Sequence, residues 1–404
     1  MIRRARVLSF AALALLAEAE TAQSSPYYVG ISQALSHESN LLRLLEGQPT
    51  PDGSSKSDTV SSTGLVAGID QRFGRQRLSG SGSLRANRYN SNSDYNSGGY
   101  SANLGLDWET INNLSGNVSI GADRKQRPDL RDVNNQVVTV SNDETAKRFS
   151  LTAALGMAGP LAIEAGLSGS DLRYSAAVAE YAEYKESGGS LGLRYRLGGA
   201  TSVALAFRQS SVNYPNLLVG QIDRNDRRKR SDVDFNVVYT PTGSSRFDLR
   251  ISQGKTRYDQ FTERDFSGTT GALAWTFNPG GRLRFNTRLA RDTGQNSGVA
   301  TTASSQITDI LRVSADYDVT GKIVATGSAE GYRRTLDSSG RFSSGIRGTD
   351  SGGTYSLGAR WEALRSLTVG CQASYEKRGR NNQPVLSDAY SASVYSCYGQ
   401  FVLQ

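Results

Sequence analysis

The sequence feature that most constrains the fold is an alternation of apolar and polar residues with a period of two. In the segment 282–289, Arg-Leu-Arg-Phe-Asn-Thr-Arg-Leu, the odd positions are mostly apolar and the even positions are arginine or asparagine. Alternate side chains of a pleated strand point to opposite faces, so the segment is predicted to be a strand with one apolar and one polar face. The same alternation recurs in 190–197, 202–208 and 232–239. The pattern predicts an all-β protein.

About eighteen such segments follow one another from Tyr27 to the C-terminus, each near the roughly 9–11 residues that a tilted strand needs to cross hydrocarbon. Short turns, such as 73–76, 240–243 and 278–281, alternate with polar loops of roughly ten to twenty residues, as in outer-membrane barrels. The predicted strands begin near Tyr27, Thr59, Arg77, Ser101, Leu114, Ala146, Leu161, Ser190, Ser202, Ser231, Arg246, Gly268, Leu283, Ile307, Ile323, Thr354, Leu367 and Ala389. The predicted fold is a transmembrane antiparallel up-and-down β-barrel of about 18 strands.

A soluble β-sandwich or propeller is the alternative, because alternating strands with one polar face also occur there. Aromatic residues favour the barrel, since they concentrate at strand ends on the apolar face, where a membrane-interface girdle lies. They are Phe73, Trp108, Tyr239, Phe277, Trp361 and Phe401. Unpaired backbone groups are costly in hydrocarbon, so the last strand, which runs to the final residues, is expected to pair with the first.

The first residues have the character of an export signal. Arg3, Arg4 and Arg6 precede an apolar run over 7–17, and Ala17-Glu18-Ala19 places small residues at the two positions that a signal peptidase reads. We therefore expect a signal peptide over residues 1–19, a single barrel domain over 20–404, and a location in a bacterial outer membrane, with its lipid as a partner. No nucleic-acid partner is expected. The one strongly basic block is 227–230, Arg-Arg-Lys-Arg, and an exported chain seldom meets nucleic acid.

Composition argues against catalysis and against metal binding. The chain has a single histidine, His37, beside Glu38, and no nucleophile is placed next to it by the sequence. Gly-rich phosphate loops are absent from the sequence, and its glycines fall in predicted strands and turns. We expect no enzymatic activity, no metal and no cofactor.

The polar face of the strands is predicted to line the barrel interior. Inward positions include the arginines Arg194, Arg196, Arg208, Arg246, Arg250, Arg284, Arg288, Arg312 and Arg360. A guanidinium group presents a planar fork of donors that suits carboxylates, phosphates and sulfates, so these side chains are candidate contacts for an acidic polysaccharide or another anion. The alternative is that arginines and acids of adjacent strands neutralise one another and only fill the lumen. Both interpretations remain open at this point.

The two cysteines, Cys371 and Cys397, fall on the last two predicted strands, and in a symmetric hairpin they would lie directly opposite each other. The periplasm is oxidising, which favours a disulfide. Two free thiols facing lipid are the alternative. In either case the pair is expected to be structural.

Several short motifs, taken together in their order and spacing, resemble a known family. They are Tyr28-Val29-Gly30, the run 39–44, Ser57-Asp58-Thr59, Arg75-Gln76-Arg77, Trp108 with 114–116, Asp123-Arg124, and Cys397 with 400–404. In these motifs the chain is similar to EpsL-type outer-membrane proteins of exopolysaccharide biosynthesis clusters. The resemblance implies a porin-like barrel that works with an inner-membrane polysaccharide assembly system and passes the polymer out of the cell. It supplies no catalytic residues, and a structural role is expected for 40–44.

These observations lead to one main functional expectation and two alternatives. The main expectation is an outer-membrane channel that exports a hydrophilic, acidic exopolysaccharide and has periplasmic or inner-membrane assembly proteins as partners. The alternatives are a general diffusion porin for small solutes, and an adhesin or structural barrel that acts through its long loops.

Overall fold

The computed structural model describes residues 25–404 apart from 52, 112, 129–136, 138, 220–221, 261, 263–264, 297–303, 341–342, 380–381 and 383–387. The predicted signal peptide, 1–19, lies outside the described residues. Among the described residues, no helix is both long enough and apolar enough to cross a membrane. Two short 3-10 helices are described, η1 (Ser93–Tyr95) and η2 (Ala177–Ala182).

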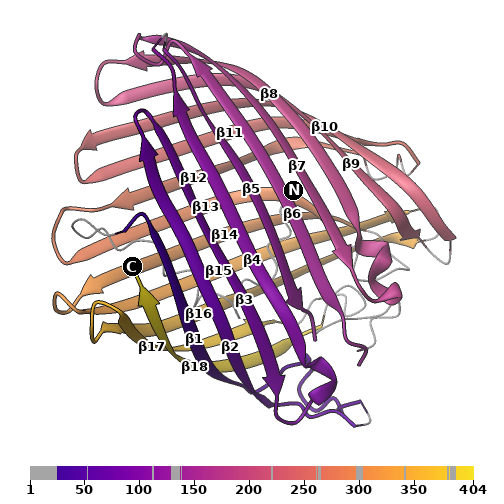
Figure 1. The fold of residues 1–404 in the computed structure, drawn as a ribbon. Helices are drawn as coiled ribbons and strands as arrows, with labels where there is room; N and C mark the ends of the chain where they lie inside the picture. The colour runs from indigo at the N-terminus through magenta and orange to yellow at the C-terminus, as the bar shows by residue number, and fades with distance from the viewer. Residues whose placement is uncertain are drawn as a thin grey trace.

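Eighteen antiparallel strands form a single sheet that closes on itself (Figure 1). They are β1 (Tyr27–Glu38), β2 (Asp58–Phe73), β3 (Gln76–Tyr89), β4 (Ser97–Glu109), β5 (Leu114–Gln126), β6 (Asp143–Leu155), β7 (Leu161–Tyr174), β8 (Tyr184–Leu197), β9 (Thr201–Val219), β10 (Ile222–Thr242), β11 (Ser245–Tyr258), β12 (Phe266–Phe277), β13 (Leu283–Asn296), β14 (Ser304–Asp318), β15 (Ile323–Gly340), β16 (Ser343–Glu362), β17 (Leu367–Arg378) and β18 (Tyr390–Leu403). Each strand pairs with the next along the chain. The predicted fold class is confirmed.

The seam between the first and last strands closes the barrel. The pairing of β1 with β18 runs without a register shift from Val29 opposite Leu403 to Glu38 opposite Val394. Every strand therefore has a hydrogen-bonded neighbour on both sides. This arrangement removes the sheet edges whose unpaired N–H and C=O groups would be costly in hydrocarbon.

All eighteen strands are longer than the predicted length of about ten residues, and the shortest have 12. The strands of the β9–β10 hairpin have 19 and 21 residues, and those of the β15–β16 hairpin have 18 and 20. The predicted starts at Ser190, Ser231 and Thr354 are wrong, because β8, β10 and β16 begin at Tyr184, Ile222 and Ser343. Both faces of these extra segments are largely polar, so the alternation that marks a membrane strand is lost although the backbone pairing continues.

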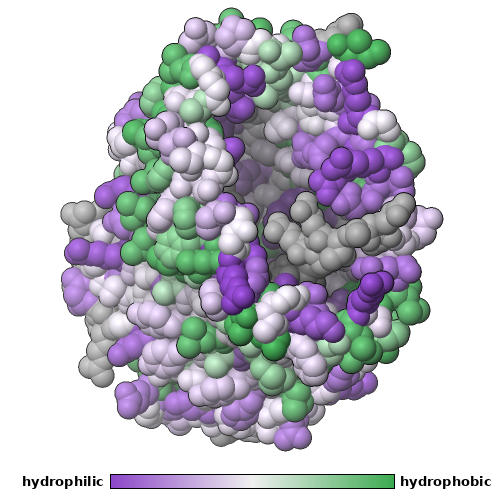
Figure 2. All heavy atoms as spheres, turned by 90° about the vertical axis from the view of Figure 1, so that its left-hand side faces the viewer, coloured by the Kyte–Doolittle hydropathy of each residue, from purple (hydrophilic) through white to green (hydrophobic). Residues whose placement is uncertain are grey.

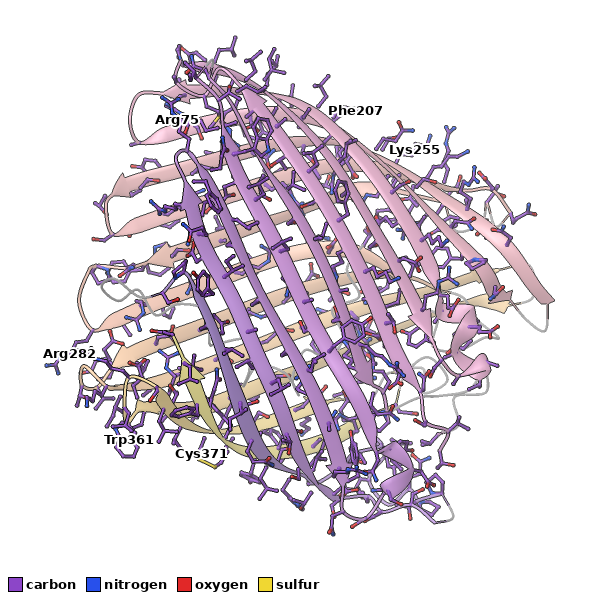
Figure 3. All side chains as sticks on the ribbon, viewed as in Figure 1. Arg75, Phe207, Lys255, Arg282, Trp361 and Cys371 are labelled. Atoms are coloured by element: carbon purple, nitrogen blue, oxygen red, sulfur yellow. A yellow bond between two sulfur atoms is a disulfide. The ribbon has the colours of Figure 1, made fainter. Side chains whose placement is uncertain are left out.

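The outer wall of the barrel is apolar in the middle of the strands. Large aliphatic and aromatic side chains on this face remain exposed, for example Leu35, Leu65, Leu205 and Phe207. Figure 3 shows Phe207 and Trp361 pointing away from the barrel. All six predicted girdle aromatics take outward positions near the short turns, and Phe247 stacks there on Trp275 with ring centroids 5.9 Å apart. An apolar band with an aromatic border is the surface that a lipid bilayer requires.

Cys371 of β17 and Cys397 of β18 are opposite each other in the register and are joined by a disulfide. Both occupy outward positions, and the sulfur of Cys371 lies on the outside of the wall in Figure 3. Of the two alternatives that the sequence left open, the structure contains the bond and not the free thiols. The bond links the last two strands beside the closing seam.

Candidate functional site: the barrel lumen

The inner face of the barrel carries the polar positions of all the strands. The even-numbered residues of β6 to β18 are inward, and so are the odd-numbered residues of β3, β4 and β5, as the cross-strand register requires. Figure 2 looks onto the end with the short turns and shows a hollow with hydrophilic side chains at its rim. The nine predicted arginines all take inward positions: Arg194, Arg196, Arg208, Arg246, Arg250, Arg284, Arg288, Arg312 and Arg360.

Most of these arginines form ion pairs with carboxylates of the same or an adjacent strand. The pairs are Arg194 with Glu164 at 2.9 Å, Arg208 with Asp234 at 3.1 Å, Arg246 with Asp248 at 2.7 Å, Arg284 with Asp318 at 2.6 Å, Arg312 with Glu330, and Arg360 with Glu362 at 3.8 Å. Arg196 instead donates to the carbonyl oxygen of Met157, at 3.0 Å. Mutual neutralisation, the alternative to anion binding, therefore describes much of the arginine set.

The arginines do not form one continuous row. Arg288 lies directly opposite Arg312, but Arg194 faces Ala204 and Arg208 faces Ser190 across the same hairpin. Acidic residues lie directly opposite Arg208, Arg284 and Arg312 in the register. The lumen wall is a mosaic of both signs of charge.

Exposure of the inward side chains falls from the turn end to the loop end of the barrel. Near the turns, the side chains of Arg246 and Asp70 are 55% and 53% exposed, as expected for groups in contact with lumen water. Towards the long loops, Arg228 and Asp350 are 1% and 2% exposed. The turn-end half is thus open to water, and the loop-end half is closely packed.

A set of buried or largely buried charged residues, most of them ion-paired, forms this packed region, which we call the loop-end collar. Its members are Glu38, Arg43, Glu144, Arg228, Arg230, Asp232, Arg334, Asp350 and Glu376. Arg334 donates from Nε to Asp350 at 2.7 Å, and Arg230 lies 2.8 Å from Asp232. Charged residues in such a packed place are stable only when they are paired and hydrogen-bonded.

None of the four arginines of the loop-end collar was among the predicted inward arginines. Arg228 and Arg230 have the inward, even parity of β10, but the predicted strand began only at Ser231. The signal that could have found them is this parity, extended back into the basic block 227–230. The register of β10 with β9 and β11 is what shows that the strand extends through this block, and therefore that its residues divide between the two faces.

Residues 40–44 hold the β1–β2 loop against the barrel. Leu41, Leu42 and Leu44 are buried against Tyr95 of η1, and the Asn40 side chain donates to the carbonyl oxygens of Leu44 and Ser391, both at 2.9 Å. Arg43 donates to Glu376 at 3.2 Å and also pairs with Glu38. Burial opposes its charge, but the carboxylates of Glu38 and Glu376 raise the pKa of Arg43 above its ordinary value, so it stays protonated. These contacts support the structural role expected for this run.

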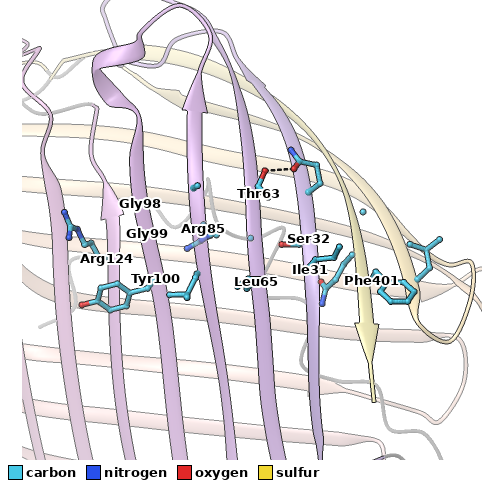
Figure 4. A pocket seen from close by; sticks show the side chains of 17 residues that line it. Ile31, Ser32, Thr63, Leu65, Arg85, Gly98, Gly99, Tyr100, Arg124 and Phe401 are labelled. Atoms are coloured by element: carbon cyan, nitrogen blue, oxygen red, sulfur yellow. Dashed lines mark hydrogen bonds between the residues drawn. The ribbon is translucent and has the colours of Figure 1, made fainter.

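His37 lies on the outward face of β1, and its Nδ1 is 3.0 Å from the hydroxyl of Thr59. No group of three or more His, Cys, Asp or Glu side chains in the described part of the chain is placed to hold a metal ion. A concavity of about 780 Å³ lies where β18 and β1 to β5 meet, lined by Ile31, Leu65 and Phe401 among others (Figure 4). Its apolar lining belongs to outward positions, so it faces lipid rather than the lumen.

No model of a protein family matches this sequence, and no curated protein matches it. Solved structures with a similar fold include the outer membrane protein OpdK from Pseudomonas aeruginosa, with 12% identity, 93% of this chain and 99% of that chain covered, and a TM-score of 0.45. OccAB3 of Acinetobacter baumannii has 10% identity, 93% and 99% coverage, and a TM-score of 0.48. The FrpB iron transporter from Neisseria meningitidis has 11% identity and a TM-score of 0.45, and the match covers 88% of this chain but only 62% of that chain.

Likenesses as distant as these carry no information on the function of the present chain. The decisive observations are the chain's own, namely the closed sheet, the apolar outer wall and the charged inner wall. A closed sheet is the one β-structure that leaves no unpaired backbone edge in lipid. The chain is an outer-membrane β-barrel of eighteen strands.

Proposed function

We propose that this barrel is a channel through which hydrophilic solutes cross the outer membrane by diffusion. The observation that carries the proposal is the state of the inward charged side chains near the turns, Arg77 with Asp70 and Arg246 with Asp248, which are paired with one another yet 39–55% exposed to water. Barrels of about 16 to 18 strands are wide enough to leave an aqueous channel. The packed loop-end collar would then be the narrow region that limits solute size.

Recording of single channels in a planar lipid bilayer tests this proposal. Purified, folded protein should produce discrete conductance steps in potassium chloride, and larger neutral sugars should reduce the conductance less than small ones because the collar excludes them. A folded barrel that gives no steps would contradict the proposal. Loop-dependent adhesion of cells by such a silent barrel would support the adhesin or structural alternative instead.

A finer function, passage of an acidic exopolysaccharide, is favoured by the arginines along the lumen and by the sequence resemblance. Guanidinium groups already paired with carboxylates can exchange partners with a passing anion, giving the weak, repeated contacts that translocation needs. In this version the barrel would receive the polymer from periplasmic or inner-membrane assembly proteins. Deletion of the gene should abolish secreted polymer, whereas a general porin would leave secretion intact.

The proposal includes two further expectations from the sequence. Residues 1–19 would be removed on export, and N-terminal sequencing of the mature protein should then begin at residue 20. The barrel would have no catalytic role, in keeping with its single histidine on the outward face. Retention of a residue before 20 would contradict the first expectation.

A further inference from the structure

The basic block 227–230 is divided between the two faces of β10. Arg228 and Arg230 point inward and are buried in the loop-end collar. Arg227 and Lys229 take the outward positions and are exposed. The block is therefore two separate features, and the function proposed for the lumen gives no role to its outward half.

The neighbouring strand adds two more outward cations. Lys255 and Arg257 of β11 are exposed, and Lys229 lies directly opposite Arg257 in the register. Figure 3 shows Lys255 extending away from the barrel wall. We call Arg227, Lys229, Lys255 and Arg257 the cationic patch.

The cationic patch has little compensating charge. Asp259, 3.6 Å from Lys229, is the one acidic side chain of the described residues within ion-pair distance of it. Like charges directly opposite on neighbouring strands destabilise a sheet. An anion bound between Lys229 and Arg257 would remove that repulsion.

The cationic patch lies just beyond the apolar wall. The last apolar outward residues of the two strands are Val233 and Ile251, each four positions from a patch lysine, which corresponds to about 13 Å along a strand. The positions between them, Ser231 and Gln253, are polar and uncharged. With strands tilted by roughly 45°, the patch lysines stand about 9 Å above the hydrocarbon and the patch arginines, two positions farther along their strands, about 14 Å above it. These heights are at the level of lipid headgroups and within reach of long cationic side chains.

The patch belongs to one side of the membrane. Short turns mark the periplasmic end of such a barrel and long loops the outer end, and the patch lies at the loop end. At the turn end of the same two strands, the outward positions hold Tyr239 and Phe247. The charge is therefore directed to the outer leaflet.

We infer that the cationic patch binds the phosphorylated headgroup of a glycolipid in the outer leaflet. The arginines would hold phosphate oxygens through paired N–H donors, and the lysines would act as point charges beside them. Ser211 and Asn213 of β9, directly opposite Lys229 and Arg227, supply further polar groups at the same level. The acyl chains would lie on Phe207, Val233 and Ile251, which are exposed on the wall below.

Binding of purified bis-phosphorylated lipid A to the detergent-solubilised, folded protein tests the inference. The variant R227Q/K229Q/K255Q/R257Q should bind this lipid about tenfold more weakly than the unaltered protein, because the charge-assisted contacts are lost. The control is R88Q/K147Q/R333Q/K377Q, which changes the net charge equally at exposed outward positions on four separate strands. It should bind within about twofold of the unaltered protein. Lipid A stripped of both phosphates should bind all three proteins equally weakly.

An equal loss of affinity in both variants would overturn the inference, since it would indicate attraction by net charge alone. Unchanged affinity of the patch variant would overturn it too. A heat-modifiable gel shift shows whether each variant is folded. Should the fourfold variant fail to fold, R227Q/K229Q and K255Q/R257Q can be measured separately, with about threefold losses expected for each. Because the patch is outside the lumen, channel conductance is a separate measurement, and the two proposals can fail independently.

Discussion

Asp58 illustrates how one residue holds two outer loops together. It is the first residue of β2, seven positions beyond Leu65, the last apolar outward residue of that strand, so it lies outside the membrane. Its buried carboxylate accepts hydrogen bonds from the backbone N–H groups of Ser91 and Asn92, at 3.0 and 2.8 Å. Burial alone would raise its pKa, but these hydrogen bonds outweigh burial and lower the pKa of Asp58 below its ordinary value.

The loop 90–96 should therefore loosen in acid. Because the folded pKa of Asp58 is lowered, its stabilising contribution is complete above the unfolded value of about 3.9 and is lost as the pH falls through the folded pKa. Pepsin cleavage within 90–96 is measured at pH 4.5 and at pH 2, and the rate in the unaltered protein is divided by the rate in Asp58→Asn at the same pH. This ratio should be higher at pH 2 than at pH 4.5. Asp58→Asn should be open at both pH values, and equal protection of the two proteins would contradict the assignment.

Arg284 should influence which ions pass through the lumen. Its guanidinium makes two hydrogen bonds to Asp318, at 2.6 and 2.7 Å, so Arg284→Ala leaves one uncompensated carboxylate at the inner wall. The reversal potential in a salt gradient should shift towards cations by several millivolts, an effect that salt screens. Arg284→Ala/Asp318→Ala restores the charge balance and should return the potential to that of the unaltered channel. A shift that persists in the double variant would show that charge is not the cause.

At the scale of elements, the closing seam limits the size of the side chains along it. Gly30 of β1 lies against β18, and a Cβ placed there would be 2.3 Å from the carbonyl oxygen of Phe401. Gly399 of β18 pairs with the neighbouring Gln33 and has open space where its Cβ would be. The two glycines of this strand pair therefore differ in whether a side chain can replace their hydrogen.

Gly30→Ala should prevent β1 from pairing with β18. An open barrel exposes strand edges, so the variant should lose most of the heat-modifiable folded band on a gel. Gly399→Ala is the matched control and should keep that band. Equal folding of both variants would show that the seam can absorb the clash.

At the scale of the whole molecule, the barrel separates two solvents with one sheet. Leu311 of β14 is outward and 48% exposed, whereas Ser314 of the same strand is inward between Asn286 and Ser328. The two positions are three residues apart. What differs is the medium that each side chain meets.

Leu311→Arg should lower the free energy of unfolding by about 2–4 kcal/mol, because the charge is forced into hydrocarbon. Ser314→Arg, which places the same group in the wet lumen near Asp316, should change it by less than about 1 kcal/mol. Denaturant unfolding in lipid vesicles, followed by tryptophan fluorescence, measures both values. Similar losses in the two variants would argue against a lipid-facing outer wall.

The period of two was sufficient to predict the eighteen strands, their order and the face of each predicted arginine, because parity is a local property of the chain. It was not sufficient to predict where β8, β10 and β16 begin, because these strands start beyond the membrane, where both faces of the hairpin are polar. Nor could it pair Arg284 with Asp318, or Arg43 with Glu376, since these partners lie on different segments.

By itself the sequence determined an all-β barrel with an apolar outer face and a charged inner face, since a repeating alternation over about eighteen segments leaves few other solutions for the chain. Only the tertiary structure decided which charges neutralise each other, where the lumen is packed and where it is open, and how the block 227–230 divides between collar and membrane surface. The physical reason is register. Whether a residue is odd or even in its strand can be read from the sequence. Its contacts depend on how far neighbouring strands are shifted along one another and on which loops fold back against the wall.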